Sequence, residues 1–220
     1  MKQKLIAGNW KMNGNLSANE ALVRAVLAGA ATGCQVAMCV PSVYLSQVQA
    51  LVAGSGIWLG AQDVSAHEHG AYTGEVSAAM LREIGVRCCI VGHSERRQHH
   101  AESDALVAMK AKQALAAGIT PMVRVPNGNP EWVTRVLEGG ALGVIVPHVR
   151  SADEARRVVA AAKFAPVGER SFAGGAAQLQ FRAFPAVQAM AVLNAATMVT
   201  VMMETLEALE QVEAIAAVDG

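Results

Sequence analysis

Seven short apolar runs, separated by amphipathic stretches, constrain the fold of this chain more than any other feature of its sequence. The runs are almost continuous in hydrophobicity, which is typical of parallel strands buried on both faces. The stretches between them have helical character, so strand and helix alternate along the chain. This order predicts a parallel sheet covered by helices, either a (β/α)8 barrel or a doubly wound sheet. The strands are expected at 4–7, 35–40, 57–60, 87–91, 121–125, 143–146 and 198–203.

Local signals mark several helix ends. Ser17 with Glu20, and Ser151 with Glu154, have the spacing of capping boxes, with serine at the N-cap and glutamate at N3. Gly118 follows an apolar helical stretch, where a left-handed C-cap glycine is expected.

Composition narrows the class of protein. The 220 residues are 53% hydrophobic, which predicts one domain over 1–220 with a large core and excludes intrinsic disorder. Lys+Arg 18 and Asp+Glu 18 cancel, so no electrostatic footprint points to nucleic acid or to an anionic membrane. The sequence has no apolar run long enough for a signal peptide or a membrane span, so we expect a cytoplasmic protein. Cys88 and Cys89 fall in a predicted strand and are interpreted as small core residues.

Three motifs in the first half follow predicted strands one, three and four. They are AGNWKMN at 7–13, AQDV with GAYTGEVS within 61–77, and IVGHSERR at 90–97. Together they make this part of the chain, from residue 1 to about 118, resemble the triosephosphate isomerase family. Their length and order make chance agreement very unlikely.

The resemblance implies an isomerase site at the carboxyl ends of the strands, where the groups of a barrel converge. Lys11 would supply a cation for a phosphate and a developing enediolate, with Asn9 binding substrate beside it. His93 would polarise a substrate carbonyl; triosephosphate isomerase is itself the known example of a neutral histidine in that role. Glu95 would pair with Lys11 and steady it. No cofactor is implied.

The same resemblance implies a homo-oligomer. The loop over 62–77 is similar to the family's dimer loop, with Thr73 reaching the partner's active site. Gln62 and Glu75 are the other interface residues expected from this loop.

The second half departs from the isomerase pattern at the fifth strand. It carries PMVRVP at 121–126, a long GGALGVIVPHVRSADEA phrase at 139–155, GERS at 168–171 and VMMET at 201–205. These phrases resemble the HpcH/HpaI aldolase family, whose members are metal-dependent (β/α)8 barrels acting next to pyruvate. The resemblance implies that Arg124 binds a keto-acid carboxylate and that Glu204 is a ligand of Mg²⁺ or Mn²⁺. The family's partner aspartate has no counterpart here, so the metal is doubtful.

The two halves predict a hybrid barrel of the (β/α)8 TIM type, joined near 118–123, with 1–118 isomerase-like and 119–220 aldolase-like. It lacks a predicted eighth strand. Each site is incomplete, because the sixth strand leads into PHVR at 147–150 instead of the isomerase's glutamate-bearing lid, and the aldolase's base is absent. Two structural alternatives stay open: Glu204 caps a helix beginning at Thr205, or Arg124 simply pairs with Glu204.

Three functional hypotheses follow. The first is a hybrid barrel with parts of both sites and little or no catalysis, binding a small phosphorylated or keto-acid ligand. The second is a triosephosphate isomerase that uses a substitute base, His148 or Glu204. The third is a non-catalytic protein that self-associates through exposed barrel edges or through the loop over 62–77.

Overall fold

The structure is a computed structural model of the chain and describes residues 4–29 and 33–220. The chain forms two compact units, each built from two segments. The first unit comprises Met1–Val91 with Asp104–Pro121, and the second comprises Gly92–Ser103 with Met122–Gly220. The predicted single domain over 1–220 stays a prediction.

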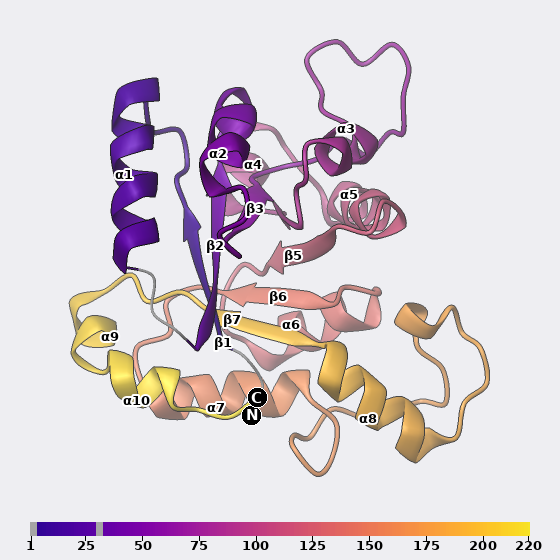
Figure 1. Cartoon of the computed structure of the whole chain (residues 1–220). Helices are drawn as coiled ribbons and strands as arrows, with labels where there is room; N and C mark the ends of the chain where they lie inside the picture. Colours follow the sequence, from indigo (N-terminus) through magenta and orange to yellow (C-terminus); the bar gives the residue numbers. More distant parts are fainter. Residues whose placement is uncertain (1–3, 30–32) are drawn as a thin grey trace. The chain divides into compact units, whose positions relative to one another are not determined.

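Four parallel strands form the sheet of the first unit: β1 (Lys4–Asn9), β2 (Cys34–Val40), β3 (Trp58–Ala61) and β4 (Cys88–Val91). Its helices are α1 (Leu16–Gly29), α2 (Leu45–Val52) after a short 3-10 turn, α3 (Ala78–Glu83) and α5 (Asp104–Ala116). Helices α1 and α2 pack side by side (Figure 1). Asn19 on α1 donates to Gln47 Oε1 at 3.1 Å, and Gln47 donates back to the Leu16 carbonyl at 2.7 Å.

A row of small residues crosses this sheet. Cys39 pairs with Gly60, and Gly60 pairs with Cys88, so the two thiols lie on either side of a glycine on the middle strand. Both cysteines and Cys89 are fully buried, which confirms their interpretation as core residues. A hydrogen bond with the Cys88 thiol, together with burial, raises the pKa of Cys39 well above its usual range.

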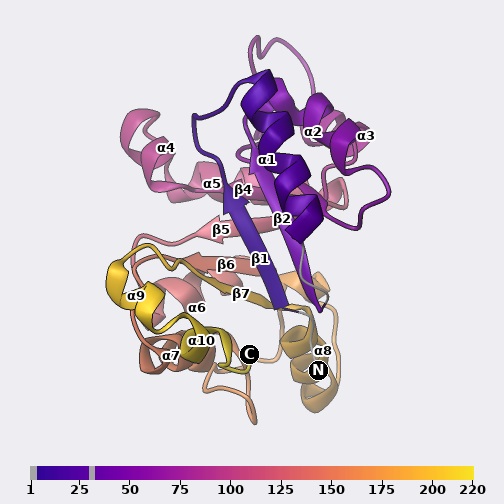
Figure 2. The same ribbon diagram turned by 60° about the vertical axis from the view of Figure 1, so that its left-hand side comes forward.

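The second unit contains the remaining elements, except that the first two residues of β5 belong to the first unit. Helix α4 (Ser94–His99) comes from its first segment. Strands β5 (Thr120–Arg124), β6 (Gly143–Val146) and β7 (Met198–Val201) are parallel neighbours (Figure 2). The remaining helices are α6 (Pro130–Glu138), α7 (Ala152–Ala162), α8 (Ala186–Ala196), α9 (Leu206–Glu210) and α10 (Val212–Ala216).

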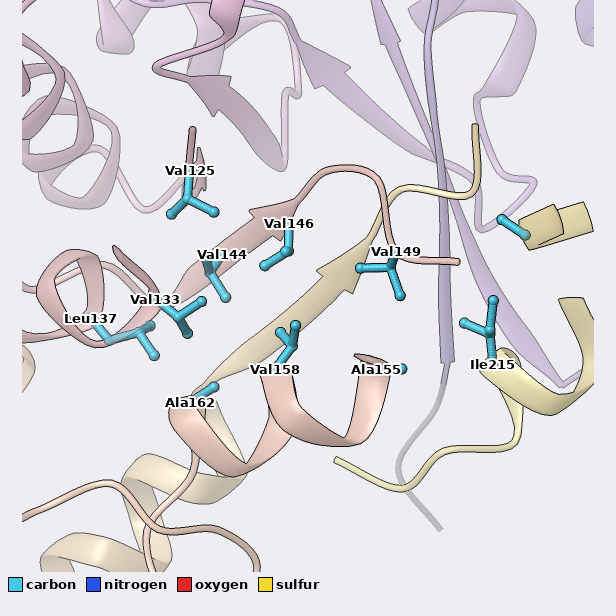
Figure 3. Close-up of a cluster of buried hydrophobic side chains, with 11 residues drawn as sticks. Val125, Val133, Leu137, Val144, Val146, Val149, Ala155, Val158, Ala162 and Ile215 are labelled. Atoms are coloured by element: carbon cyan, nitrogen blue, oxygen red, sulfur yellow. The ribbon is translucent and has the colours of Figure 1, made fainter. Parts of the chain in front are cut away.

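Aliphatic side chains from strand and helices form the core of this unit. Val144 and Val146 on β6 face Val158 and Ala162 on α7, with Leu137 from α6 beside them (Figure 3). Strands β4 and β6 are apolar and buried at every residue, so helices must cover both of their faces to remove that surface from water.

All seven predicted strands are present, within two residues of the expected bounds at either end, and Gly143–Val146 matches in full. The order of the described strands in the sheet is the order of the chain. A parallel sheet of this order with alternating helices is the TIM-barrel type of α/β fold, as predicted. No helix in the described part of the chain has the length and hydropathy that a membrane span requires.

Two of the three predicted helix ends are confirmed. Ser151 Oγ accepts from the Glu154 amide at 3.2 Å, and Gly118 takes a left-handed φ of +73° after α5. The capping box at Ser17 was wrong, because α1 begins at Leu16 and Ser17 is already inside the helix. Asn15 Oδ1 accepts from the Ala18 amide at 2.9 Å and serves as the cap instead.

Candidate functional site

The carboxyl ends of three strands in the second unit carry polar side chains. Arg124 is the last residue of β5, His148 follows β6 by two residues, and Glu204 follows β7 by three. Because β5, β6 and β7 are parallel neighbours, these positions lie at one edge of their sheet. In barrels of this type the same edge carries the active site.

Arg124 is a buried cation with a donor that no protein acceptor in the described part of the chain satisfies. The residue is 7% exposed, and its Nε has no acceptor among the described residues. Nη1 donates to the Pro126 carbonyl at 3.5 Å, the outer limit of a hydrogen bond. Burial lowers the pKa of Arg124; the Glu204 carboxylate opposes that shift, and the Arg97 guanidinium adds to it. An anion placed here would accept from a guanidinium that the protein leaves unsatisfied.

Arg97 is the site residue that the sequence analysis missed. It lies on α4, and its Nε donates to the Gly92 carbonyl at 2.9 Å. The motif that contains it was interpreted only for His93 and Glu95. The repeated arginine in the phrase ERR at 95–97 was the available signal, but nothing in the sequence indicates that its charge acts on Arg124.

Glu204 is held by His148. Its Oε1 accepts from the His148 backbone amide at 3.1 Å and lies 2.9 Å from the ring nitrogen Nδ1. The alternative in which Glu204 caps a helix is wrong, because Thr205 caps α9 by accepting from the Ala208 amide. Nor does Glu204 form an ion pair with Arg124 among the described residues; it acts on that arginine only through its charge.

His93 lies just before α4 and is 8% exposed. Its Nδ1 contacts the Glu95 carboxylate, which also accepts from Ser94 Oγ at 3.0 Å. A ring held through Nδ1 presents Nε2 to its other side. Glu95 therefore steadies His93, whereas its predicted pairing with Lys11 stays a prediction, since Lys11 belongs to the first unit.

Lys11 and Asn9 form a separate group in the first unit. Asn9 ends β1, and its Oδ1 accepts from the Lys11 amide at 2.9 Å. Lys11 is exposed and has a left-handed φ of +51°, an uncommon conformation for a residue with a side chain. Gln62 holds this turn from β3, donating to the Lys11 carbonyl at 2.9 Å and to the Cys39 carbonyl at 3.0 Å. The predicted interface residue Gln62 thus positions the Lys11 backbone.

The two other predicted interface residues lie in the loop after β3. Thr73 is exposed, whereas the Glu75 carboxylate accepts from Ser65 Oγ within the loop. Their role between subunits stays a prediction.

The residues present do not fit the divalent metal of the aldolase family. Within residues 4–29 and 33–220 no three His, Cys, Asp or Glu side chains come together in a group that could hold a metal ion. Glu204 is a single carboxylate, and one of its oxygens already accepts two contacts from His148. A hard divalent cation wants several oxygen ligands, so no step of a mechanism is derived through it.

The fold and these strand-end groups define a TIM-barrel-type α/β protein. Comparison with known families is more specific. The triosephosphate isomerase family model matches residues 4–137, and the HpcH/HpaI aldolase/citrate lyase model matches residues 91–220. Each match covers more than half of the chain, so the chain belongs to both families, through different and overlapping parts.

Individual relatives agree with the first of these matches. The chain is 69% identical over 126 residues to triosephosphate isomerase from Albidiferax ferrireducens, covering 57% of this chain and 51% of the relative. It is 50% identical over 163 residues to the Thiobacillus denitrificans isomerase, covering 73% of this chain and 65% of that one. The crystal structure of the Bartonella henselae isomerase superposes with a TM-score of 0.64 at 33% identity, covering 73% of this chain and 74% of that one. The chain spans about half the length of the first curated relatives that it matches.

Proposed function

We propose that this protein is a hybrid barrel that binds a small oxyanion, the carboxylate of a keto acid or a phosphate group, at Arg124, and that it catalyses neither parental reaction at an enzymatic rate. The observation that carries the proposal is the Arg124 guanidinium, buried with its Nε unsatisfied. A buried charged group without a partner costs at least about 1–3 kcal/mol, and a bound anion recovers that energy. Arg97 adds a second positive charge nearby, which favours an anion further.

Loss of catalysis follows from the groups that surround this anion site. The isomerase reaction needs a carboxylate base above the substrate, and 147–150 supplies Pro, His, Val and Arg in its place. Removing a general base costs roughly 10²–10⁴-fold in rate. The aldolase reaction needs a metal that the residues at Glu204 do not fit. Of the parental site groups, His93 keeps its burial and its contact with Glu95, and it is suited to donate to a bound carbonyl or phosphate oxygen.

The test is a titration of the whole chain with pyruvate and with dihydroxyacetone phosphate, followed by calorimetry. We expect saturable binding of at least one of them, and at least tenfold weaker binding by Arg124→Met. Arg157→Met is the matched control, because Arg157 is exposed and pairs with Glu154 on the same helix. Equal affinity of the wild type and Arg124→Met would overturn the proposal.

Turnover is measured on the same samples, to test a second candidate function, a residual triosephosphate isomerase. The His148–Glu204 pair is the observation that favours a residual isomerase, because it places a possible base at a strand end. Isomerase activity that disappears in His93→Gln and in Glu204→Gln would replace the proposed function with that one. Activity at the buffer rate in all samples, with and without Mg²⁺, is the result we expect.

Self-association is a further part of the proposal. Ile6 on β1 is 59% exposed and Thr73 lies at an exposed loop, so β1 and the loop over 62–77 are the surfaces we propose for homo-oligomer formation in the cytoplasm. Light scattering during gel filtration tests this directly, and a strictly monomeric peak at high concentration would count against it.

A further inference from the structure

A second buried arginine, Arg170, also lacks hydrogen-bond acceptors. The residue is 8% exposed, and neither Nε nor Nη1 of its guanidinium has an acceptor among the described residues. Burial lowers the pKa of Arg170, as expected for a cation removed from water without an ion pair. Buried guanidinium groups are normally paired with carboxylates or phosphates, so this arrangement points to a missing anionic partner.

The surroundings of Arg170 hold it in place. Its Cζ lies 4.6 Å from the centre of the Phe164 ring, a cation–π contact that fixes the plane of the guanidinium. Its backbone amide donates to the Lys163 carbonyl at 2.9 Å. The Asn194 side chain in turn clamps Phe164, accepting from its amide at 2.7 Å and donating to its carbonyl at 2.9 Å. Phe172 packs edge-on against the Phe164 ring at 5.6 Å.

Lys163 completes this frame. It is fully buried, and its Nζ donates to the carbonyls of Asn194 and Thr197, which lie at the carboxyl end of α8. The ammonium group neutralises the negative end of that helix and joins it to the segment carrying Arg170. The guanidinium is therefore preorganised, which lowers the entropy cost of binding a ligand.

The carboxylate that acts on Arg170 does not take the place of a bound anion. Glu138, the last residue of α6, raises the pKa of Arg170 through its charge, but it forms no ion pair with Arg170 among the described residues.

This position differs from the Arg124 site. Thr197, which accepts from Lys163, immediately precedes β7, so the frame of Arg170 is at the amino end of this strand. Arg124 and Glu204 lie at the carboxyl ends. A four-residue strand rises about 13 Å, which separates the two sites on opposite edges of the same sheet.

We propose that Arg170, stacked on Phe164, is a second oxyanion-binding site, taking a phosphate or a carboxylate at the amino-terminal edge of the second unit's sheet. The proposal does not depend on the function proposed for Arg124. The ligand enters through the small exposed fraction of the residue and accepts hydrogen bonds from the guanidinium. Titration with phosphate and with acetate, one at a time, distinguishes the two chemistries.

The experiment follows the side-chain Nε–Hε resonances of arginine in the intact chain by ¹⁵N NMR, during titration with inorganic phosphate or sodium acetate at constant ionic strength. Arg170→Met and Arg124→Met assign the two resonances. We expect the Arg170 resonance to shift and saturate, in Arg124→Met as in the wild type. The thermal midpoint should rise with phosphate in Arg124→Met, and the rise should be at least halved in Arg170→Met.

Several outcomes would overturn this proposal. If the Arg170 resonance does not move with either anion, the side chain binds neither, and ordered water is its partner instead. If the Arg170 resonance is already at its shifted position without added anion, and Glu138→Gln moves it away from that position, then Glu138 is the partner. A shift that depends on protein concentration and not on anion assigns the carboxylate to a second copy of the chain. Because Arg124→Met is measured in parallel, failure at Arg170 is distinguishable from failure of the function proposed for Arg124.

Discussion

Gly60 lies where the first unit's core leaves no room for a side chain. A Cβ at this position would come within 2.5 Å of the Cys39 sulfur, 3.1 Å of the Cys88 sulfur and 3.3 Å of the Cys39 Cα. The last of these atoms is backbone on a neighbouring strand, so the sheet cannot yield by rotating a side chain. We expect Gly60→Ala to destabilise the chain by about 1–3 kcal/mol, measured by urea unfolding.

Gly8→Ala is the control for this substitution. Gly8 is also a strand glycine of the first unit, and an added Cβ would meet only the Ala37 carbonyl oxygen, at 4.0 Å. Its free energy of unfolding should stay within about 0.5 kcal/mol of the wild type. Equal losses of stability in the two variants would mean that the cost comes from replacing any strand glycine, and not from contact with Cys39 and Cys88.

Thiol reactivity should separate the four cysteines. None of them forms a disulfide in the structure; Cys34 is half-buried, and Cys39, Cys88 and Cys89 are buried. The raised pKa of Cys39 also keeps that thiol protonated and unreactive. We expect a disulfide reagent to label one thiol per chain quickly and the other three at the rate of unfolding. Cys34→Ser should remove the fast phase, and a fast phase of two or more thiols would contradict this assignment.

Some residues of the candidate site could be predicted from the sequence, but their hydrogen-bond partners could not. Arg124 could be singled out because it lies in a phrase that resembles the aldolase family, PMVRVP at 121–126. The unsatisfied donors of Arg170 were not found, because whether a buried group has a partner depends on side chains far away in sequence. The contact between His148 and Glu204, 56 residues apart, has the same origin. Such pairings arise from packing and leave no local pattern.

At the scale of elements, helix caps give a matched test of local structure. Ser151 accepts from the Glu154 amide at 3.2 Å, and the Glu154 carboxylate accepts from the Arg150 amide at 2.7 Å. Ser151→Ala should cost about 1 kcal/mol in thermal or urea unfolding. Ser17→Ala removes a serine of the same apparent motif, yet Asn15 caps α1, so we expect little change. A loss at Ser17 as large as that at Ser151 would show that α1 begins elsewhere in solution.

The strands were predictable for a different reason from the caps. A strand buried on both faces must be apolar at every position, so its sequence identifies it without any knowledge of its neighbours. A cap depends on which of several nearby polar residues reaches the amide. In α1 both Asn15 and Ser17 are suited to the role, and the turn that contains Asn15 decides between them.

At the scale of the whole molecule, the two family matches and the two units meet in one region. The matches overlap over residues 91–137. The chain passes between the units after Val91, after Ser103 and after Pro121, and all three passages fall inside that overlap. His93 and Arg124 both lie inside the overlap, and they belong to the same unit.

This interleaving predicts cooperative unfolding. The segment Gly92–Ser103 belongs to the second unit but is joined at both ends to the first, so unfolding of the first unit releases α4 and weakens the second. Trp10 and Trp58 report on the first unit and Trp132 on the second. In Trp132→Phe, and separately in a Trp10→Phe/Trp58→Phe double variant, the fluorescence midpoint in urea should coincide with the far-UV circular dichroism midpoint of the same variant. Midpoints that differ in either variant would mean that the two units unfold independently. The interleaved segments within residues 91–137 would then not couple the folding of the two units.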